Sequence, residues 1–256
     1  EGRMGLYFLT PGAIQRPSEV LYDRAHSAFA QVGGGEHNWA SLLVGADWLH
    51  VSGVTPALGQ QAADRTLEAV RAARAVGVKV SFDGNFRPKL WDAWKSDPAT
   101  ILHGLMAEAD ILFASHRDIE VVLGRTFEQA TAQERFRASA EAAFAAFPNL
   151  QRMAATIRVQ RSVDHHALSA IDAVRGGANH VTPVYEVASI VDRIGTGDAF
   201  AAGVLHGAIT GMEDGHGLHF GVAAACLKHS IPGDFNLVGV SEVNAILEEG
   251  GFDVRR

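Results

Sequence analysis

The chain of 256 residues is 47% hydrophobic and 20% charged, the composition of an ordinary globular protein with enough length for a large core. Its formal net charge of -7, with lysines and arginines scattered along the chain, argues against nucleic acid as a partner. No apolar stretch approaches the ~20 residues that a membrane-spanning helix needs. One cysteine, Cys226, cannot form an internal disulfide. The sequence therefore predicts a cytoplasmic protein that does not enter a membrane, with Cys226 as a buried structural thiol.

The first 30 residues are predicted to form a small β segment. Residues 5–10 and 20–30 are short runs with aromatic side chains, separated by the turn-forming "PGAIQRPS". They are expected to pair as an edge hairpin. A glycine-rich loop, "VGGGEHN", follows at 32–38.

After this loop, short apolar runs alternate with helix-like stretches. We expect strands at 47–53, 78–85, 109–115, 153–158, 165–171 and 180–191, and mostly helix from Asp198 onward. Such alternation predicts an α/β fold, with a parallel sheet covered by helices on both faces. Ligands of such sheets bind beyond the carboxyl ends of the strands. The candidate residues at those ends are Ser52, Gly53, Asp83, Asn85, Ser115, Thr156, Arg158, Asp192 and Asp198.

The stretch "DRIGTGDAF" (192–200) turns from an apolar run into a predicted helix through two glycines and Asp198. The first backbone N–H groups of a helix have no partner within the helix, and together with the helix dipole they form an anion site. Asp198 then has two interpretations. It either caps the helix, or it accepts a proton from a hydroxyl while the amides hold a phosphate. The spacing alone leaves both open.

Other phosphate-binding and metal-binding patterns are missing from the sequence. No G-x-x-x-x-G-K-[ST] occurs, and the G-x-G at 195–197 is not followed by x-x-G. His165 and His166 are adjacent and are expected to point to opposite faces of a strand, so they do not predict a metal site.

Several segments resemble the ribokinase-like (PfkB) sugar kinases. "DRIGTGDAFAAGVLHG" is similar to that family's D-T-x-G-A-G-D-x-F signature. The segments "GLYFLTPG", "YDRAHSAFA", "WLHVSGVTPALG", "FDGNFRPKLW", "ATIR" and "KHSIPGDFN" follow the order seen in 2-keto-3-deoxygluconate kinases. The resemblance implies a ribokinase-like, Rossmann-type α/β sandwich with a central, mainly parallel sheet flanked by helices. It assigns residues 1–30 to a β lid and 31–256 to the nucleotide- and sugar-binding core.

On the nucleotide side, the resemblance implies that Asp198 is the general base. The amides of Gly195, Thr196 and Gly197 would form the anion hole. Arg158 resembles the arginine that faces the nucleotide phosphates, and Gly233 of "IPGD" resembles the turn beside the adenine.

On the substrate side, Tyr22 and Arg24 of "YDR" match residues of the lid that hold the ketodeoxy acid, and Arg24 suits a carboxylate. Tyr7 is similar to another substrate-side tyrosine. Asn85 and Arg87 are expected to contact the substrate, with Arg87 also placed toward the phosphates. Without the resemblance, the two tyrosines fit ordinary edge-strand aromatics, and Asn85 and Arg87 fit turn formers.

The chain also departs from the family pattern. Arg193 stands where the family has threonine, and Thr196 where it has alanine, although threonine still offers its backbone amide. The family's N-x-x-E motif, linked to magnesium, is here Ser115 to Asp118, and the shorter carboxylate of Asp118 would hold magnesium through water. The family's glycine-rich sugar motif is not found, so we expect either further residues upstream of Glu1 that would supply it, or a protein that lacks part of the sugar pocket.

The resemblance implies ATP-dependent phosphorylation of the primary hydroxyl of 2-keto-3-deoxygluconate or a close ketodeoxy sugar acid, with ATP and Mg²⁺ bound. It leaves a monovalent cation open and allows a homodimer paired through the lid. Two alternatives stay open. One is the same chemistry on a neutral sugar or nucleoside, such as fructose or ribose; the other is a sugar- or nucleotide-binding relative without turnover.

Overall fold

The computed structural model describes residues 2–32 and 37–248, which divide into two compact units. The first unit comprises Glu1–Phe8, Leu21–Ala155 and Ala173–Ala178, and the second comprises Leu9–Val20, Thr156–Asp172 and Asn179–Arg256. Residues 33–36 of the expected glycine-rich loop lie outside the described residues. A two-stranded sheet of β1 (Leu6–Thr10) and β2 (Glu19–Asp23) forms the predicted hairpin near the start of the chain.

The sheet of the first unit is parallel. It orders β3 (Trp48–Ser52), β4 (Lys79–Asp83), β5 (Ile111–Phe113) and the beginning of β6 (Arg152–Gln160). The register places Ser52 opposite Asp83, and Asp83 opposite Phe113, so these strands reach the same edge. The strand β5 is apolar and buried throughout, and the three central residues of β4, Val80, Ser81 and Phe82, are fully buried, as expected for a sheet covered on both faces.

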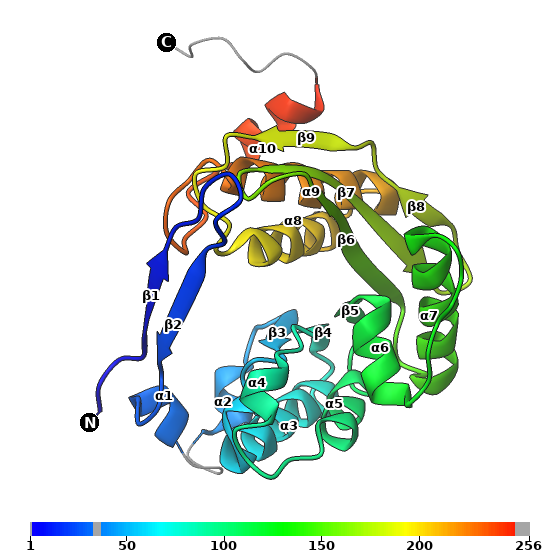
Figure 1. Ribbon diagram of the computed structural model, residues 1–256. Helices are drawn as coiled ribbons and strands as arrows, with labels where there is room; N and C mark the ends of the chain where they lie inside the picture. The colour runs from blue at the N-terminus through cyan, green and yellow to red at the C-terminus, as the bar shows by residue number, and fades with distance from the viewer. Residues whose placement is uncertain (1, 33–36, 249–256) are drawn as a thin grey trace. The chain divides into compact units, whose positions relative to one another are not determined.

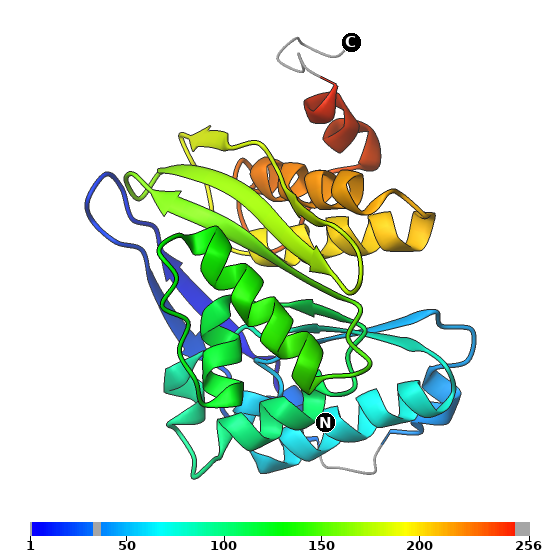
Figure 2. The same cartoon turned by 90° about the vertical axis from the view of Figure 1, so that its right-hand side faces the viewer.

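Helices of the first unit surround this sheet (Figures 1 and 2). The helix α3 (Gln60–Ala75) packs on β3 and β4 and contacts α5 (Pro98–Met106), because small side chains recur on one of its faces at helical spacing. The short helices and the 3₁₀ turn are α1 (Ala28–Gln31), α2 (Trp39–Leu42), η1 (Pro56–Leu58) and α4 (Pro88–Trp91). The longer helices are α3 (Gln60–Ala75), α5 (Pro98–Met106), α6 (His116–Leu123) and α7 (Ala132–Ala146).

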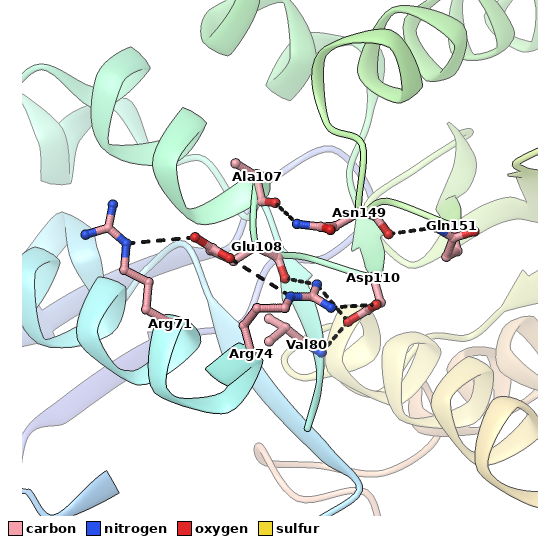
Figure 3. Close-up of polar contacts among 8 residues, drawn as sticks. All are labelled: Arg71, Arg74, Val80, Ala107, Glu108, Asp110, Asn149 and Gln151. Carbon is pink, nitrogen blue, oxygen red and sulfur yellow. Dashed lines mark hydrogen bonds and ion pairs between the residues drawn. The ribbon is translucent and has the colours of Figure 1, made fainter. Parts of the chain in front are cut away.

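A polar network fixes α3 to the amino end of β5 (Figure 3). Arg74 of α3 donates from Nη1 to Oδ1 of Asp110 at 3.1 Å, and the other carboxylate oxygen of Asp110 accepts the Val80 N–H at 2.8 Å. Arg71 adds a 3.8 Å contact between its Nε and Oε1 of Glu108. Because Asp110 directly precedes β5, this network lies at the end of the sheet opposite to the strand ends that carry the candidate residues.

The second unit contains the rest of β6, with β7 (His165–Val174) next to it, then β8 (Asn179–Val181) beside β7. The strand β9 (Tyr185–Ala188) pairs antiparallel with β7. The helices α8 (Thr196–Thr210) and α9 (Asp214–Lys228) lie side by side, and α10 (Val240–Leu247) packs on α9 (Figures 1 and 2).

Glycines let α8 and α9 approach closely. A Cβ on Gly203 of α8 would lie 2.6 Å from the α-carbon of Gly221 in α9. A Cβ on Gly207 would likewise lie 2.8 Å from the α-carbon of Gly217. Contacts this short involve backbone atoms that cannot step aside, so the two glycine pairs set the distance between the helices.

The α/β architecture, the mainly parallel sheet and the helical C-terminal part are confirmed, while two expected strands need correction. The strand expected at 20–30 ends at Asp23, because Ser27 begins α1 by accepting the Ala30 N–H with its hydroxyl. The strand expected at 180–191 is divided into β8 and β9, since Pro183 between them has no N–H for a sheet hydrogen bond. No helix in the described part of the chain has both the length and the apolar character needed to cross a bilayer.

The glycine contacts give the first prediction. Gly203→Ala is expected to lower the free energy of unfolding by about 1–3 kcal/mol, because the added methyl overpacks the backbone of α9. Urea unfolding followed by circular dichroism measures the change. The matched control is Gly104→Ala in α5, whose Cβ would meet only Leu67 Cδ1 at an ordinary 3.7 Å. This control is expected to be neutral or to stabilise by up to about 1 kcal/mol. Equal effects of the two variants would contradict the packing argument.

Candidate active site

The helix α8 begins with free backbone donors. Gly195 is its N-cap and adopts the left-handed conformation, with φ 74° and ψ 3°. The first backbone hydrogen bond joins Ala199 N to Gly195 O at 2.9 Å, so the N–H groups of Thr196, Gly197 and Asp198 have no partner within the helix. A Cβ on Gly197 would meet nothing within 4 Å. The start of α8 is therefore an open set of donors suited to an anion.

Asp198 lies in the first turn of α8 but does not cap it. Gly195 occupies the N-cap position, and α8 has no side-chain capping hydrogen bond. The side chain of Asp198 is exposed, and nothing in the described part of the chain pairs with its carboxylate. The capping interpretation is thus contradicted, and the carboxylate is accessible beside the free amides.

The loop before α8 is held by Asp192. Oδ1 of Asp192 accepts the Ile194 N–H at 3.0 Å, and Oδ2 accepts the Gly233 N–H at 2.8 Å. Gly233 has φ 83°, a conformation that favours glycine. A Cβ on Gly195 would lie 2.5 Å from the carbonyl oxygen of Asp234, so the turn at 231–234 packs directly on the start of α8.

Arg158 and Arg193 form a positive region in the same unit. Arg158 projects from β6 with much of its surface exposed, and no carboxylate of the described residues pairs with it. Partial desolvation, and then the like charge of Arg193, lower the pKa of Arg158, although a guanidinium remains charged at neutral pH. An anion bound between these two guanidinium groups would offset their mutual electrostatic repulsion.

The first unit holds the remaining candidates at strand ends and near the hairpin. Asn85 follows β4 with φ 40°, and its Nδ2 donates to Oγ of Ser52 at the end of β3 at 3.2 Å. Arg87 is exposed at the start of α4, and its Nη1 donates to the neighbouring Phe86 carbonyl at 3.3 Å. A Cβ on Gly53 would lie 2.0 Å from the Gly84 carbonyl, so glycine is required where these loops meet.

Asp118 has a structural role in the first unit. Its Oδ2 accepts hydrogen bonds from both the N–H and the hydroxyl of Ser115 at 2.7 Å, which forms the capping box of α6. Its Cγ and Oδ1 lie against Gly84, where a Cβ would be 3.1 Å from each. No group of three or more metal-binding side chains occurs among the residues that the structure describes. Asp118 alone therefore fits a magnesium ion only through water.

The hairpin brings Tyr22 and Arg24 together. The guanidinium carbon of Arg24 lies 4.2 Å from the centroid of the Tyr22 ring, a cation–π contact. Arg3 pairs with the intervening Asp23, so that carboxylate is already engaged. No carboxylate within 2–32 or 37–248 pairs with Arg24. Tyr7 lies half-buried on β1. The sequence-predicted residues thus fall into one group per unit: Tyr7, Tyr22, Arg24, Asn85, Arg87 and Asp118 in the first, and Arg158, Gly195, Thr196, Gly197, Asp198 and Gly233 in the second.

Residues 5–236 match the model of the pfkB family of carbohydrate kinases. The chain belongs to this family. It is 33% identical over its whole length to 2-dehydro-3-deoxygalactonokinase of Haloferax volcanii, of which it covers 74%. It is 27% identical over 85% of its length to 2-dehydro-3-deoxygluconokinase of Bacillus subtilis, of which it covers 61%. Among solved structures, 2-dehydro-3-deoxygluconokinase of Thermotoga maritima superposes with a TM-score of 0.87 at 37% identity, covering 95% of this chain and 72% of that one.

Sequence reasoning missed three residues of this pfkB-family kinase. From the sequence, Asp192 is only a strand-end residue, whereas in the structure it joins the loop before α8 to the turn at 231–234. Arg193 is only a departure from the family pattern in the sequence, although its charge acts on Arg158. The sequence gives Lys228 no special role, because a lysine at a helix end is ordinarily exposed. The signal available was the short spacing between Lys228 and the "IPGD" turn.

Cys226 is half-buried, not fully buried as the sequence predicts. Burial nevertheless raises the pKa of its thiol to about 12. A thiol with this pKa stays protonated at neutral pH and is a poor nucleophile.

His166 is fully buried on β7, while neighbouring His165 is at the surface beside Glu186, which confirms that the two point to opposite faces. Both ring nitrogens of His166 lack a partner among the described residues, and its ring meets that of His229 at 6.0 Å between centroids. Burial first, and then the charges of Arg158 and Arg193, lower the pKa of His166 to about 4. The neutral imidazole is therefore the form that the fold accommodates.

A second prediction follows from His166. The unfolded chain protonates this histidine near pH 6.5 and the folded chain near pH 4, so the unfolded state binds more protons in this interval. Stability should fall as the pH drops from about 6.5 to 4, by on the order of 2–3 kcal/mol from this group. Urea unfolding of the parent and of His166→Leu at several pH values measures the difference. The variant should lose less stability than the parent over this interval, and parallel pH profiles would contradict the assignment.

Proposed function

We propose that this chain belongs to an ATP-dependent kinase that phosphorylates the primary hydroxyl of 2-keto-3-deoxygluconate or a close ketodeoxy sugar acid. The observation that carries the proposal is the exposed carboxylate of Asp198 beside the free amides at the start of α8. The named relatives act on 2-dehydro-3-deoxy sugar acids, which supports the choice of acceptor. The 2-dehydro-3-deoxygalactono- acceptor of one relative is the nearest variant within this class.

In the proposed reaction, Asp198 accepts the proton of the acceptor hydroxyl as its oxygen attacks the γ-phosphorus in line. The bond between the γ-phosphorus and the bridging oxygen breaks, and ADP leaves with the electron pair. The N–H groups of Gly195, Thr196 and Gly197 bind the charge that develops on the phosphoryl oxygens. Because these donors are fixed by the fold, they need no reorganisation when the charge appears.

Arg158 would face the nucleotide phosphates, and Gly233 would border the adenine. The charge of Arg193 beside Arg158 favours an anion at this place. Magnesium, when bound with ATP, offsets phosphate charge, and Asp118 would hold it through water. No position for a monovalent cation is proposed from these residues.

On the acceptor side, we propose that residues 1–30 form a lid over the sugar acid, with 31–256 as the core. Arg24, which has no carboxylate partner among the described residues, would bind the carboxylate of the acceptor while Tyr22 and Tyr7 contact its carbon chain. Asn85 and Arg87 would contact the acceptor from the strand ends. The exposed apolar side chains of β1 and β2, Leu6, Phe8 and Leu21, support a homodimer paired through this lid.

Asp198→Asn tests catalysis against mere binding. The amide keeps the shape but cannot accept the proton, so kcat is expected to fall by roughly 10²–10⁴-fold. A coupled ADP-release assay measures turnover, and calorimetry measures ATP affinity, which should stay near that of the parent. The matched control is Asp214→Asn, a first-turn carboxylate of α9, which should keep the activity of the parent. Full activity of the Asp198→Asn variant would show that the protein is not a kinase of this mechanism.

Arg24 tests the class of acceptor. Arg24→Gln is expected to raise KM for 2-keto-3-deoxygluconate by roughly tenfold or more, since a charged hydrogen-bonded pair is lost. Its effect on fructose and ribose should be small, because neither has a carboxylate. The assay compares these sugars and 2-keto-3-deoxygalactonate, with the exposed Arg137→Gln on α7 as a control. A higher kcat/KM of the parent for a neutral sugar would overturn the sugar-acid assignment.

A further inference from the structure

Lys228 is a fully buried cation at the end of α9. Its exposed fraction is 0%, and its Nζ donates to the carbonyl oxygens of Ile231 at 2.9 Å and Gly233 at 2.7 Å. No carboxylate of the described residues lies within ion-pair distance of it. A buried ammonium held by neutral carbonyl groups lowers the stability of the fold, because the ammonium loses its hydration without gaining a full counter-charge. A charge kept in the fold at this cost makes Lys228 a candidate for a role beyond packing.

Lys228 and Asp192 act on the same glycine from two sides. The ammonium of Lys228 binds the carbonyl of Gly233, while the carboxylate of Asp192 binds the N–H of Gly233. The N–H groups of Val191 and Asp192 also donate to the His229 carbonyl at 2.9 and 3.2 Å. The turn that follows α9 is thereby tied to the loop that precedes α8.

This connection reaches the anion site directly. The residue after Gly233 is Asp234, whose carbonyl oxygen would be 2.5 Å from a Cβ on Gly195. Gly195 is the left-handed N-cap that turns the free amides of α8 outward. A shift of the 231–234 turn would therefore move Gly195, or release it from its only compatible conformation. All of these contacts lie within the second unit.

We propose that Lys228 is a positioning residue for phosphate binding, a proposal that rests on the proposed function. Its ammonium fixes the 231–234 turn against Gly195 and supplies from within the chain a positive charge that an inorganic cation would otherwise have to bring. Carbonyl oxygens of this kind coordinate potassium or ammonium as readily as a lysine ammonium. Phosphoryl transfer by this protein should then be independent of monovalent cations.

The alternative is that Lys228 only satisfies carbonyl groups beyond the end of α9, as basic residues near helix C-termini commonly do. A purely structural lysine would affect stability without separating the two substrates in the kinetics. The positioning role predicts a specific loss on the ATP side and its repair by a small cation.

The test uses Lys228→Ala, which leaves a carbonyl-lined space, and Lys228→Met, which fills it with an apolar chain. In a buffer that contains Mg²⁺ and has tetramethylammonium as its only monovalent cation, Lys228→Ala should lower kcat/KM for ATP by roughly tenfold or more, with KM for the sugar acid unchanged. Ammonium or potassium should restore activity to Lys228→Ala and not to Lys228→Met. The exposed Lys95→Ala serves as the control and should match the parent.

Equal ATP parameters in the parent and a folded Lys228→Ala, or a loss that no small cation repairs, would overturn the proposal. If the variants do not fold, the parent protein tests the proposal. Stimulation of its activity by potassium would overturn the proposal, and activity that potassium does not change would support it. Calorimetric measurement of ATP binding by the parent and the variants distinguishes a failure of the Lys228 proposal from a failure of the proposed function. A parent that binds ATP yet phosphorylates none of the acceptors would contradict the function, while the comparison of ATP affinities would still test Lys228.

Discussion

The contact between Gly195 and the Asp234 carbonyl is the constraint on which the candidate active site depends. There is no room for a side chain at position 195, and its φ of 74° belongs to the left-handed region. This conformation allows the chain to leave the loop at 192–194 and begin α8 with its amides uncovered. The anion site is therefore a property of the backbone, maintained by what packs behind it.

Charge is distributed around this backbone site in a way that separates binding from proton transfer. The charged groups of Asp192 and Lys228 form hydrogen bonds with backbone groups of the loop before α8 and the turn at 231–234. Asp198 is exposed and has no such partner in the part of the chain that the structure describes, and no carboxylate in that part pairs with Arg158 or Arg193. The charged groups that shape this backbone site are thus paired, whereas Asp198, Arg158 and Arg193 have no partner of opposite charge among the described residues.

The helix pair α8 and α9 gives this arrangement its rigidity. Glycines at 203, 207, 217 and 221 bring the two helix backbones together, so α8 and α9 pack closely along their length. The first unit shows a similar division between stability and function. Its Arg74 and Asp110 network lies at the amino end of the sheet, while Ser52 and Asn85 lie at the carboxyl end, where parallel sheets place their ligands.

The sequence by itself determined the α/β class, the family and the identity of the catalytic candidate. Alternation of apolar strands with helices has a strong period, and the glycine–aspartate turn at 195–198 is local in the chain, so both can be recognised without coordinates. The ends of the strands are harder to predict from the sequence, since the end of β2 depends on capping by Ser27. Only the tertiary structure decided that Asp198 does not cap its helix. Only it revealed that Asp192, 41 residues away in the chain, binds the same glycine as Lys228, which is five residues away. The physical reason is that a carboxylate or an ammonium can pair with any group that folding brings near it, and sequence spacing does not encode that choice.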